Sequence, residues 1–329
     1  MVKLWMIAII KENIKQWLTQ QLTSYQWDPL PGDASFRQYY RVLHADRTYI
    51  AMDASHEKQS CIPFAAIAQS LRKQGLNTPD IFASDFTQGF LLLADFGNRL
   101  YLNELNMTNM LSHYHHALDA LHIMQPCKID GWILKPFTKE FMRNELNLFK
   151  EWFLEKHLAL TLTHSMNNML DASFDFLSNS AASQPYVFMH RDYHSANLMI
   201  LPNDQVGILD FQDAFIGPVT YDLVSLLRDC YITWPEETVH QLVMSFFEKI
   251  KLPNVSAEAF LCWFDWMGMQ RHLKALLTFS RKYRRDNNAN YLQHIPRTLN
   301  YVVSISQRYP ETKALHQFLT SMVVEKCVE

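Results

Sequence analysis

The segment from residue 187 to residue 210 constrains the fold more than any other part of the chain. It reads as a short apolar strand, a polar loop that carries Asp192 and Asn197, and two further apolar strands around a turn. Asp210 follows the last of these strands directly. Short apolar runs separated by turn residues are typical of a β-hairpin. We therefore expect the hairpin to deliver two carboxylates and one amide oxygen to one of its edges.

The remaining sequence predicts an α+β fold with two lobes. Only 8 of the 329 residues are glycine, which disfavours a many-turned all-β protein because tight turns need glycine. Strands are expected at 36–42, 48–52, 80–83 and 90–94, and helices at 4–22 and 62–74. Residues 101–178 and the chain after residue 221 have mainly helical patterns. We expect a small β-rich N-terminal lobe over residues 1–97 and a larger helical lobe over residues 98–329.

Composition excludes several classes of function. The formal net charge is −3 and no basic stripe is present, so no nucleic-acid partner is expected. No apolar run reaches the length of about 18 residues that a transmembrane helix requires. The five cysteines are widely spaced and form no CxxC pair, which favours a reducing cytoplasm over a disulfide framework or a zinc ribbon. The sequence leaves the oligomeric state open.

The polar residues of the 187–210 segment suit phosphoryl transfer. In that chemistry one Asp orients the acceptor hydroxyl, while an Asp and an Asn hold Mg²⁺ on the phosphates, because hard cations prefer oxygen ligands. The spacing H-x-D-x-x-x-x-N from His190 to Asn197 matches the catalytic loop of protein kinases, and Asp210 stands where their metal-binding Asp stands. The alternative interpretation is an ordinary polar loop.

Beyond this spacing, the segment HRDYHSANLMI…VGILDFQDAFIGPVTYDLVSLL resembles the aminoglycoside phosphotransferase-like kinases, which have a protein-kinase-like fold. Three further motifs resemble one branch, the bacterial anomeric sugar kinases acting on N-acetylmuramate and N-acetylglucosamine. They are PGDASFRQYYR at 31–41, MDA at 52–54 and GFLLLADFG at 89–97. The resemblance covers roughly residues 12–310.

The resemblance implies roles for the polar residues of this segment. Asp192 corresponds to the catalytic base, and His190 to a residue that braces the catalytic loop. Asn197 and Asp210 correspond to the Mg²⁺ ligands. Asp222 corresponds to a buried acid that ties down the loop. The alternative is that Asp222 is an ordinary carboxylate at a helix N-terminus, where the helix dipole favours negative charge.

The expected cofactors are ATP and Mg²⁺, with the nucleotide phosphates covered by the loop at 32–40. The candidate nucleotide contacts are Gly32, Asp33, Ser35, Phe36, Arg37 and Arg41. One departure from kinases is that the strand at 48–53 lacks the lysine that normally contacts the phosphates, and Asp53 sits near its place. Arg37, Arg41 and Lys58 are the candidates for the missing cation.

The acceptor pocket is expected in the helical lobe, where the stretch 263–283 combines aromatic and basic residues. Arg271 is the candidate acceptor ligand, because arginine pairs bidentately with a carboxylate such as that of N-acetylmuramate. The alternative is a core helix with a polar outer side. The leading functional hypothesis is an ATP-dependent kinase of the anomeric hydroxyl of an amino sugar in cell-wall recycling. The alternatives are an aminoglycoside or choline-type amino-alcohol kinase and a nucleotide-binding pseudokinase scaffold.

Overall fold

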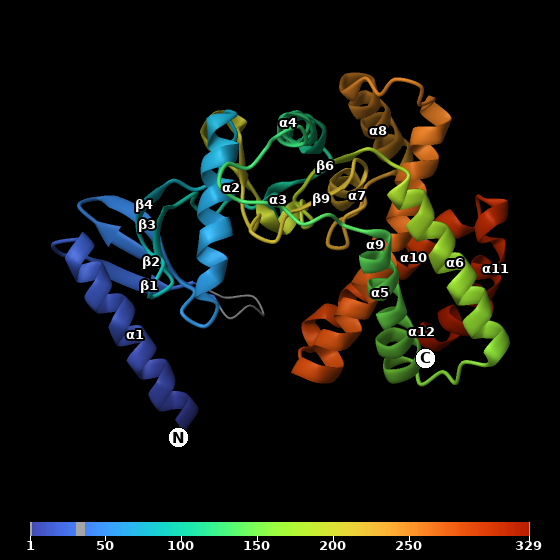
Figure 1. The fold of residues 1–329 in the computed structure, drawn as a ribbon, viewed down its shortest axis with the longest axis horizontal. Helices are drawn as coiled ribbons and strands as arrows, with labels where there is room; N and C mark the ends of the chain where they lie inside the picture. The colour runs from blue at the N-terminus through green and yellow to red at the C-terminus, as the bar shows by residue number, and fades with distance from the viewer. Residues whose placement is uncertain (1, 31–36, 329) are drawn as a thin grey trace. The chain divides into compact units, whose positions relative to one another are not determined.

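The structure is a computed structural model that describes the backbone of residues 2–30 and 37–328 and the side chains of residues 12–30 and 37–327. The chain divides into two compact units, each described here by itself (Figure 1). The N-terminal unit comprises Met1–Asn103, Cys127–Ile133 and Leu198–Asp213. The helical unit comprises Glu104–Pro126, Leu134–Asn197 and Ala214–Glu329. The sequence predicts a single boundary after residue 97, whereas the N-terminal unit also takes in two later segments.

A five-stranded antiparallel sheet in the order β1-β2-β3-β5-β4 forms the frame of the N-terminal unit. Its strands are β1 (Gln26–Pro29), β2 (Gln38–His44), β3 (Arg47–Asp53), β4 (Ile81–Asp85) and β5 (Phe90–Ala94), and its helices are α1 (Val2–Gln21) and α2 (Cys61–Lys73). The predicted β2–β3 hairpin is confirmed, with Gln38 opposite Asp53. Strand β1 was not predicted from the sequence, because Pro29 reads as a breaker; an edge strand tolerates proline.

Both faces of this sheet are covered. Side chains on one face, including Ala51 and Leu92, pack with Trp17 and Leu18 of α1 in one apolar cluster. Successive side chains of a strand point to opposite faces, and Met52, the next residue along β3, is fully buried as well. The central strands therefore form a rigid two-sided core that fixes the positions of the residues at their ends.

The β7–β8 hairpin belongs to the N-terminal unit, although it lies about a hundred residues later in the sequence. Strands β7 (Leu198–Ile200) and β8 (Val206–Ile208) pair antiparallel, with Leu198 opposite Ile208. Ile208 donates its backbone N–H to the Asn77 carbonyl at 2.8 Å. At Gly207 a Cβ atom would lie 2.8 Å from the Phe96 ring, so this close approach requires glycine. These long-range contacts hold the hairpin within the N-terminal unit.

The helical unit contains the remaining long helices. They are α4 (Met110–Met124), α5 (Lys139–Phe149), α6 (His164–Ala182), α7 (Tyr221–Leu227), α8 (Glu236–Ile250), α9 (Ala257–Asp286), α10 (Ile295–Ser306), α11 (Lys313–Phe318) and α12 (Val324–Val328). Residues 101–103 of the short α3 (Tyr101–Glu104) belong to the N-terminal unit. Wide π-helical turns follow α5 at Lys150–His157 and α11 at Leu319–Val323. Side-chain oxygens of Thr138, Thr163 and Ser256 cap the N-termini of α5, α6 and α9.

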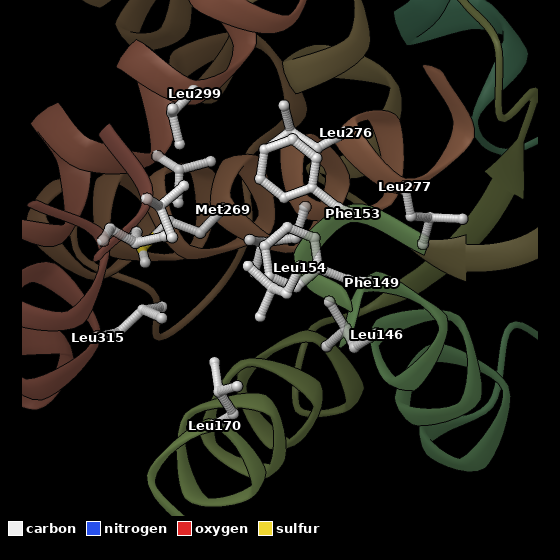
Figure 2. Packing of buried hydrophobic residues seen from close by; sticks show 14 of the residues in the cluster. Leu146, Phe149, Phe153, Leu154, Leu170, Met269, Leu276, Leu277, Leu299 and Leu315 are labelled. Atoms are coloured by element: carbon white, nitrogen blue, oxygen red, sulfur yellow. The ribbon is translucent and has the colours of Figure 1, made fainter. Parts of the chain in front are cut away.

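Helix α9 is the centre of the helical core. Met269 and Leu276 of α9 pack in one cluster with Phe149 of α5, Leu170 of α6 and Leu299 of α10 (Figure 2). Arg271 and Lys274 lie between Met269 and Leu276 along α9, so this packing fixes the part of the helix that carries them. Among the residues that the structure describes, no helix is both long and apolar enough to cross a membrane. All five cysteines are free thiols, as expected.

A two-stranded antiparallel sheet, β6 (Tyr186–Met189) with β9 (Phe215–Pro218), leads into the polar loop. Strand β6 was predicted, but β9 was not, because its four residues end in Gly217 and Pro218, which resemble a turn. The pairing of Met189 with Phe215 fixes the end of β6, where the loop begins. A Cβ atom at Gly217 would lie 2.5 Å from the Met189 sulfur, so glycine permits the close packing of the two strands.

Candidate active site

The loop after β6 is anchored by a carboxylate from α7. Asp222 is buried and accepts two consecutive backbone hydrogen bonds, from His190 N–H at 2.6 Å and from Arg191 N–H at 2.9 Å. Burial raises the pKa of Asp222 to about 7, and the two N–H groups act in the opposite direction without cancelling this effect. Both oxygens of the side chain are therefore committed to the start of the loop.

A second buried carboxylate, Asp229, holds the other end of the same loop. Its two oxygens accept the Ser195 N–H at 2.9 Å and the Tyr231 N–H at 2.7 Å. Asp229 was not predicted from the sequence. It lies beyond the end of α7 at Leu227, so no helical spacing pointed to it.

Arg191 adopts an unusual backbone conformation inside the loop. Its φ is +83°, in the left-handed region that non-glycine residues rarely occupy. Its guanidinium donates to Glu145 of α5 at 2.7 Å and lies 5.5 Å from the Phe141 ring and 5.0 Å from the Phe215 ring. The side chain thus fixes the residue that immediately precedes Asp192.

The interior of the loop orients Asp192 through short-range contacts. The Asp192 N–H donates to Nδ1 of the buried His190 ring at 3.3 Å, which assigns that nitrogen as an acceptor. The Asn197 side-chain amide donates to the Asp192 carbonyl at 3.0 Å. This hydrogen bond uses the amide nitrogen of Asn197. The amide oxygen Oδ1 is therefore the atom of this side chain that is suited to ligate a hard cation.

Asp192 opens onto a pocket within the helical unit. Its lining includes Asp192, His194, Cys230, Tyr231, Arg271, Lys274 and Phe279. Burial alone would raise the pKa of Asp192, but the charges of Lys274, His194 and Arg271 outweigh it, so the pKa lies well below its usual range. The carboxylate is therefore ionised at neutral pH inside a pocket with an excess of positive charge.

Arg271 is a buried cation facing this pocket. Only 5% of the residue is exposed, and its guanidinium lies 5.6 Å from the Tyr221 ring. Its buried Nε atom has no hydrogen-bond partner among the described residues. A buried guanidinium donor without such a partner is costly, so its placement favours an anionic ligand. Lys274, about one turn later on α9 and within the stretch 263–283 that the sequence indicated for the acceptor pocket, lines the same pocket.

In the N-terminal unit, Asp210 follows β8 and lies near a buried arginine. The Asp210 backbone is left-handed, with φ +59°, and Oδ1 accepts from Gln212 at 2.8 Å. Arg37 is 6% exposed; its Nε lies 2.9 Å from a Glu57 oxygen and its Nη1 lies 4.0 Å from Asp210 Oδ1. The Asp210 side chain is 48% exposed, so solvent and ligands reach it.

The other predicted nucleotide contacts divide into two groups. Arg41 is bound to the turn after β5: its guanidinium contacts Asp95 at 2.7 Å, the Asn98 side chain at 2.7 Å and the Gly97 carbonyl at 2.9 Å. Gly32, Asp33, Ser35 and Phe36 lie outside the described residues. In the described part of the chain, His, Cys, Asp and Glu side chains form no cluster of three that could hold a metal.

Comparison with known proteins gives consistent matches. Residues 26–252 match the phosphotransferase enzyme family. The chain is 40% identical over 299 residues to an N-acetylmuramate/N-acetylglucosamine kinase of Pseudomonas aeruginosa, covering 89% of this chain and 88% of that protein. It is 37% identical to the protein of the same name from Neisseria meningitidis serogroup B, covering 96% and 97%.

Solved structures share the fold at low sequence identity. Choline kinase LicA from Streptococcus pneumoniae superposes with a TM-score of 0.61 at 14% identity, covering 91% of this chain and 99% of that chain. Aminoglycoside phosphotransferase APH(2'')-Ib with ADP bound gives a TM-score of 0.61 at 13% identity, covering 89% and 98%. The predicted two-lobed protein-kinase-like fold, with a β-rich N-terminal lobe and a helical C-terminal lobe, is confirmed.

Proposed function

Because the chain belongs to the phosphotransferase enzyme family, we propose that it transfers the γ-phosphoryl group of ATP to the anomeric hydroxyl of an amino sugar. The proposed acceptors are N-acetylmuramate and N-acetylglucosamine, because three relatives at 34–40% identity are named N-acetylmuramate/N-acetylglucosamine kinases. The resemblance of residues 31–41 and 89–97 to anomeric sugar kinases supports the choice of hydroxyl.

The observation that carries this proposal is the environment of Asp192. Lys274, His194 and Arg271 lower the pKa of a carboxylate that lies on a pocket wall. An ionised carboxylate there accepts a hydrogen bond from the acceptor hydroxyl and aims its oxygen at the γ-phosphorus. Because phosphoryl transfer passes through a loose transition state, orientation matters more than early removal of the proton.

The same pocket favours an acceptor that is neutral or negatively charged. Arg271 and Lys274 lie on one face of α9, with Asp192 as the acidic lining residue. A lactyl carboxylate would form a charge-assisted hydrogen bond with these cations, whereas a polycation would be repelled at short range. The aromatic rings of Tyr231 and Phe279 supply apolar surface for a sugar ring.

For the nucleotide, we propose Asn197 and Asp210 as the protein ligands of Mg²⁺. Leu198 pairs with Ile208 in the β7–β8 hairpin; Asn197 directly precedes β7, and Asp210 follows β8 by two residues. Both side chains offer the oxygen atoms that Mg²⁺ prefers. When bound, Mg²⁺ neutralises charge on the β- and γ-phosphates. Asp222 and Asp229 then act by holding the loop that carries Asp192 and Asn197.

Steady-state kinetics with Mg-ATP and four acceptors tests this function. We expect N-acetylmuramate and N-acetylglucosamine to be phosphorylated, and kanamycin and choline to give far lower kcat/KM. A higher kcat/KM with kanamycin or choline contradicts the acceptor class. Absence of transfer to all four, with nucleotide still bound, favours the scaffold alternative.

A further inference from the structure

The N-terminal unit lacks a lysine at the position where kinases use one to contact the nucleotide phosphates. Strand β3 ends in Asp53, which is buried and whose Oδ1 accepts the Ser55 N–H at 2.9 Å. Asp53 therefore closes the turn after β3 and offers no positive charge. In kinases that lysine forms an ion pair with a glutamate, and both are needed for phosphoryl transfer. Another residue must supply the cation.

Of the three basic residues near this place, two are poorly suited to the role. Arg41 uses its guanidinium on Asp95, Asn98 and the Gly97 carbonyl, so its donors serve the turn after β5. Lys58 is exposed in a short 3-10 turn, where a flexible ammonium is strongly hydrated. Neither side chain is held at a buried position.

Arg37 differs from both, because it is buried and precedes β2 directly. In the sheet register Gln38 lies opposite Asp53, so Arg37 stands one residue beyond the pair that includes the usual lysine position. Arg37 therefore places a cation at the start of β2, the strand that pairs with β3. Arg37 Nε lies 2.9 Å from a carboxylate oxygen of Glu57, a residue shortly before α2. Its Nη1 lies 4.0 Å from Asp210 Oδ1.

The charges around Arg37 explain why it is suited to phosphate. Glu57 contacts the guanidinium through Nε, Nη1 is the atom that approaches Asp210, and the Tyr39 side chain forms a further hydrogen bond with Arg37. The distance of 4.0 Å is too long for a hydrogen bond, so this pair is a loose electrostatic contact. Guanidinium is also the side-chain group that matches phosphate oxygens in a planar, two-pronged geometry.

We propose that Arg37, held by Glu57, is the phosphate-binding cation of the N-terminal unit and replaces the missing β3 lysine. The proposal rests on the proposed kinase function and adds the residue that contacts the α- or β-phosphate. Arg37 is a binding residue, and Glu57 is a positioning residue that acts through it. Loss of either should weaken the binding of phosphorylated nucleotides and spare the binding of the nucleoside.

The roles of Arg37 and Glu57 can be tested by calorimetry on the full chain. The affinity for Mg-ADP is measured directly, and the affinity for adenosine is measured by competition. We expect Arg37→Met to weaken Mg-ADP binding at least tenfold and to change adenosine binding less than twofold. Arg37→Lys should recover most of the lost affinity, because it restores the charge. Glu57→Gln should give an intermediate loss. The matched control is Arg47→Met, an exposed arginine at the start of β3, which should leave both affinities unchanged.

The outcomes separate this proposal from the kinase function. Mg-ADP affinity within twofold of wild type in Arg37→Met refutes the role of Arg37 and leaves the kinase function standing. Equal losses of adenosine and Mg-ADP affinity also refute it, because they indicate general disruption. A wild-type chain that binds no nucleotide overturns both proposals. If Arg37→Met does not fold, as judged by thermal unfolding, an unchanged Mg-ADP affinity in Glu57→Gln refutes the pair.

Discussion

Replacing Asp222 with asparagine should inactivate the enzyme and stabilise its fold at alkaline pH. The change keeps the shape of the side chain but removes the negative charge. One amide oxygen still accepts a backbone N–H, while the NH₂ group faces the second N–H of the pair formed by His190 and Arg191. The start of the loop is then held by one hydrogen bond instead of two.

The magnitude follows from the burial of the carboxylate. Its pKa rises from 3.8 to about 7, so ionisation costs the folded state about 4 kcal/mol at pH 8. Asparagine avoids that cost but leaves one buried N–H without a good acceptor, which costs about 1–3 kcal/mol. We therefore expect Asp222→Asn to raise the free energy of unfolding at pH 8 by about 1–3 kcal/mol.

The pH dependence has a definite sign. Because the folded-state pKa lies above the unfolded value, the wild type takes up a proton on folding between about pH 4 and pH 7. Its free energy of unfolding therefore falls, relative to that of Asp222→Asn, as the pH rises through this window, and the difference is constant above pH 7. The stabilisation by asparagine should disappear at pH 5, and wild-type kcat should decline below pH 7 as Asp222 is protonated.

Chemical denaturation at pH 5 and pH 8, with kcat at pH 8, measures these effects. We expect kcat to fall at least tenfold, since small errors in the position of a catalytic group cost about that much or more. The control is Asp175→Asn, an exposed acid of α6, which should change neither quantity by much. A variant that is less stable than wild type at pH 8, or one with wild-type kcat, refutes this reasoning.

Three other substitutions test separate parts of the site. Asp192→Asn should lower kcat by about 10²–10⁴-fold, while calorimetry should show unchanged affinity for Mg-ATP, because the carboxylate orients the acceptor. Asp210→Ala should weaken Mg²⁺-dependent nucleotide binding at least tenfold through loss of an oxygen ligand. Arg271→Met should lower kcat/KM for N-acetylmuramate by roughly 10- to 100-fold, the worth of a charged hydrogen bond. The same variant should change kcat/KM for N-acetylglucosamine, which has no carboxylate, less than threefold.

Each of these predictions has its own contrary result. Activity of Asp192→Asn within tenfold of wild type removes Asp192 from catalysis; Asp46→Asn, in the exposed β2–β3 turn, is its control. Unchanged Mg-ATP affinity in Asp210→Ala shows that the metal has other ligands. Equal losses with both sugars in Arg271→Met would place the arginine on the transferred phosphoryl group instead of the acceptor carboxylate.

The β6, β7 and β8 strands of the candidate catalytic segment could be predicted from sequence because their pattern is local. The strands around the 190–197 loop are short apolar runs, and the β7–β8 hairpin closes around one turn. The order of Asp192, Asn197 and Asp210 along the chain is the basis of the roles that we propose for them. The β2–β3 hairpin could be predicted for the same reason, because its two strands are joined by a short turn between His44 and Arg47.

Contacts between distant segments could not be predicted in this way. Glu145 reaches Arg191 across 46 residues, and Asp229 joins Ser195 to the pocket wall at Tyr231; neither pairing leaves a periodic signal. Strand β9 was hidden by Gly217, whose small size serves the packing against β6.

Arg37 and Arg41 show the same limit at the level of single side chains. Arg37 directly precedes β2 and Arg41 lies in the middle of that strand, and the sequence ranked them alike as nucleotide contacts. Only the structure shows that Arg41 is committed to Asp95 while Arg37 lies beside Glu57 and Asp210. The difference arises from tertiary partners, which no local pattern encodes.

Phosphorus NMR of the reaction product examines the proposed transfer itself. The full chain is incubated with Mg-ATP and N-acetylmuramate, and the coupling of the new phosphorus resonance to the sugar protons identifies the phosphorylated carbon. We expect one sugar phosphate whose phosphorus couples to the single anomeric proton, with an equal amount of ADP. A phosphate coupled to the two protons of a primary carbon, or ADP formed with inorganic phosphate alone, would contradict the proposed reaction.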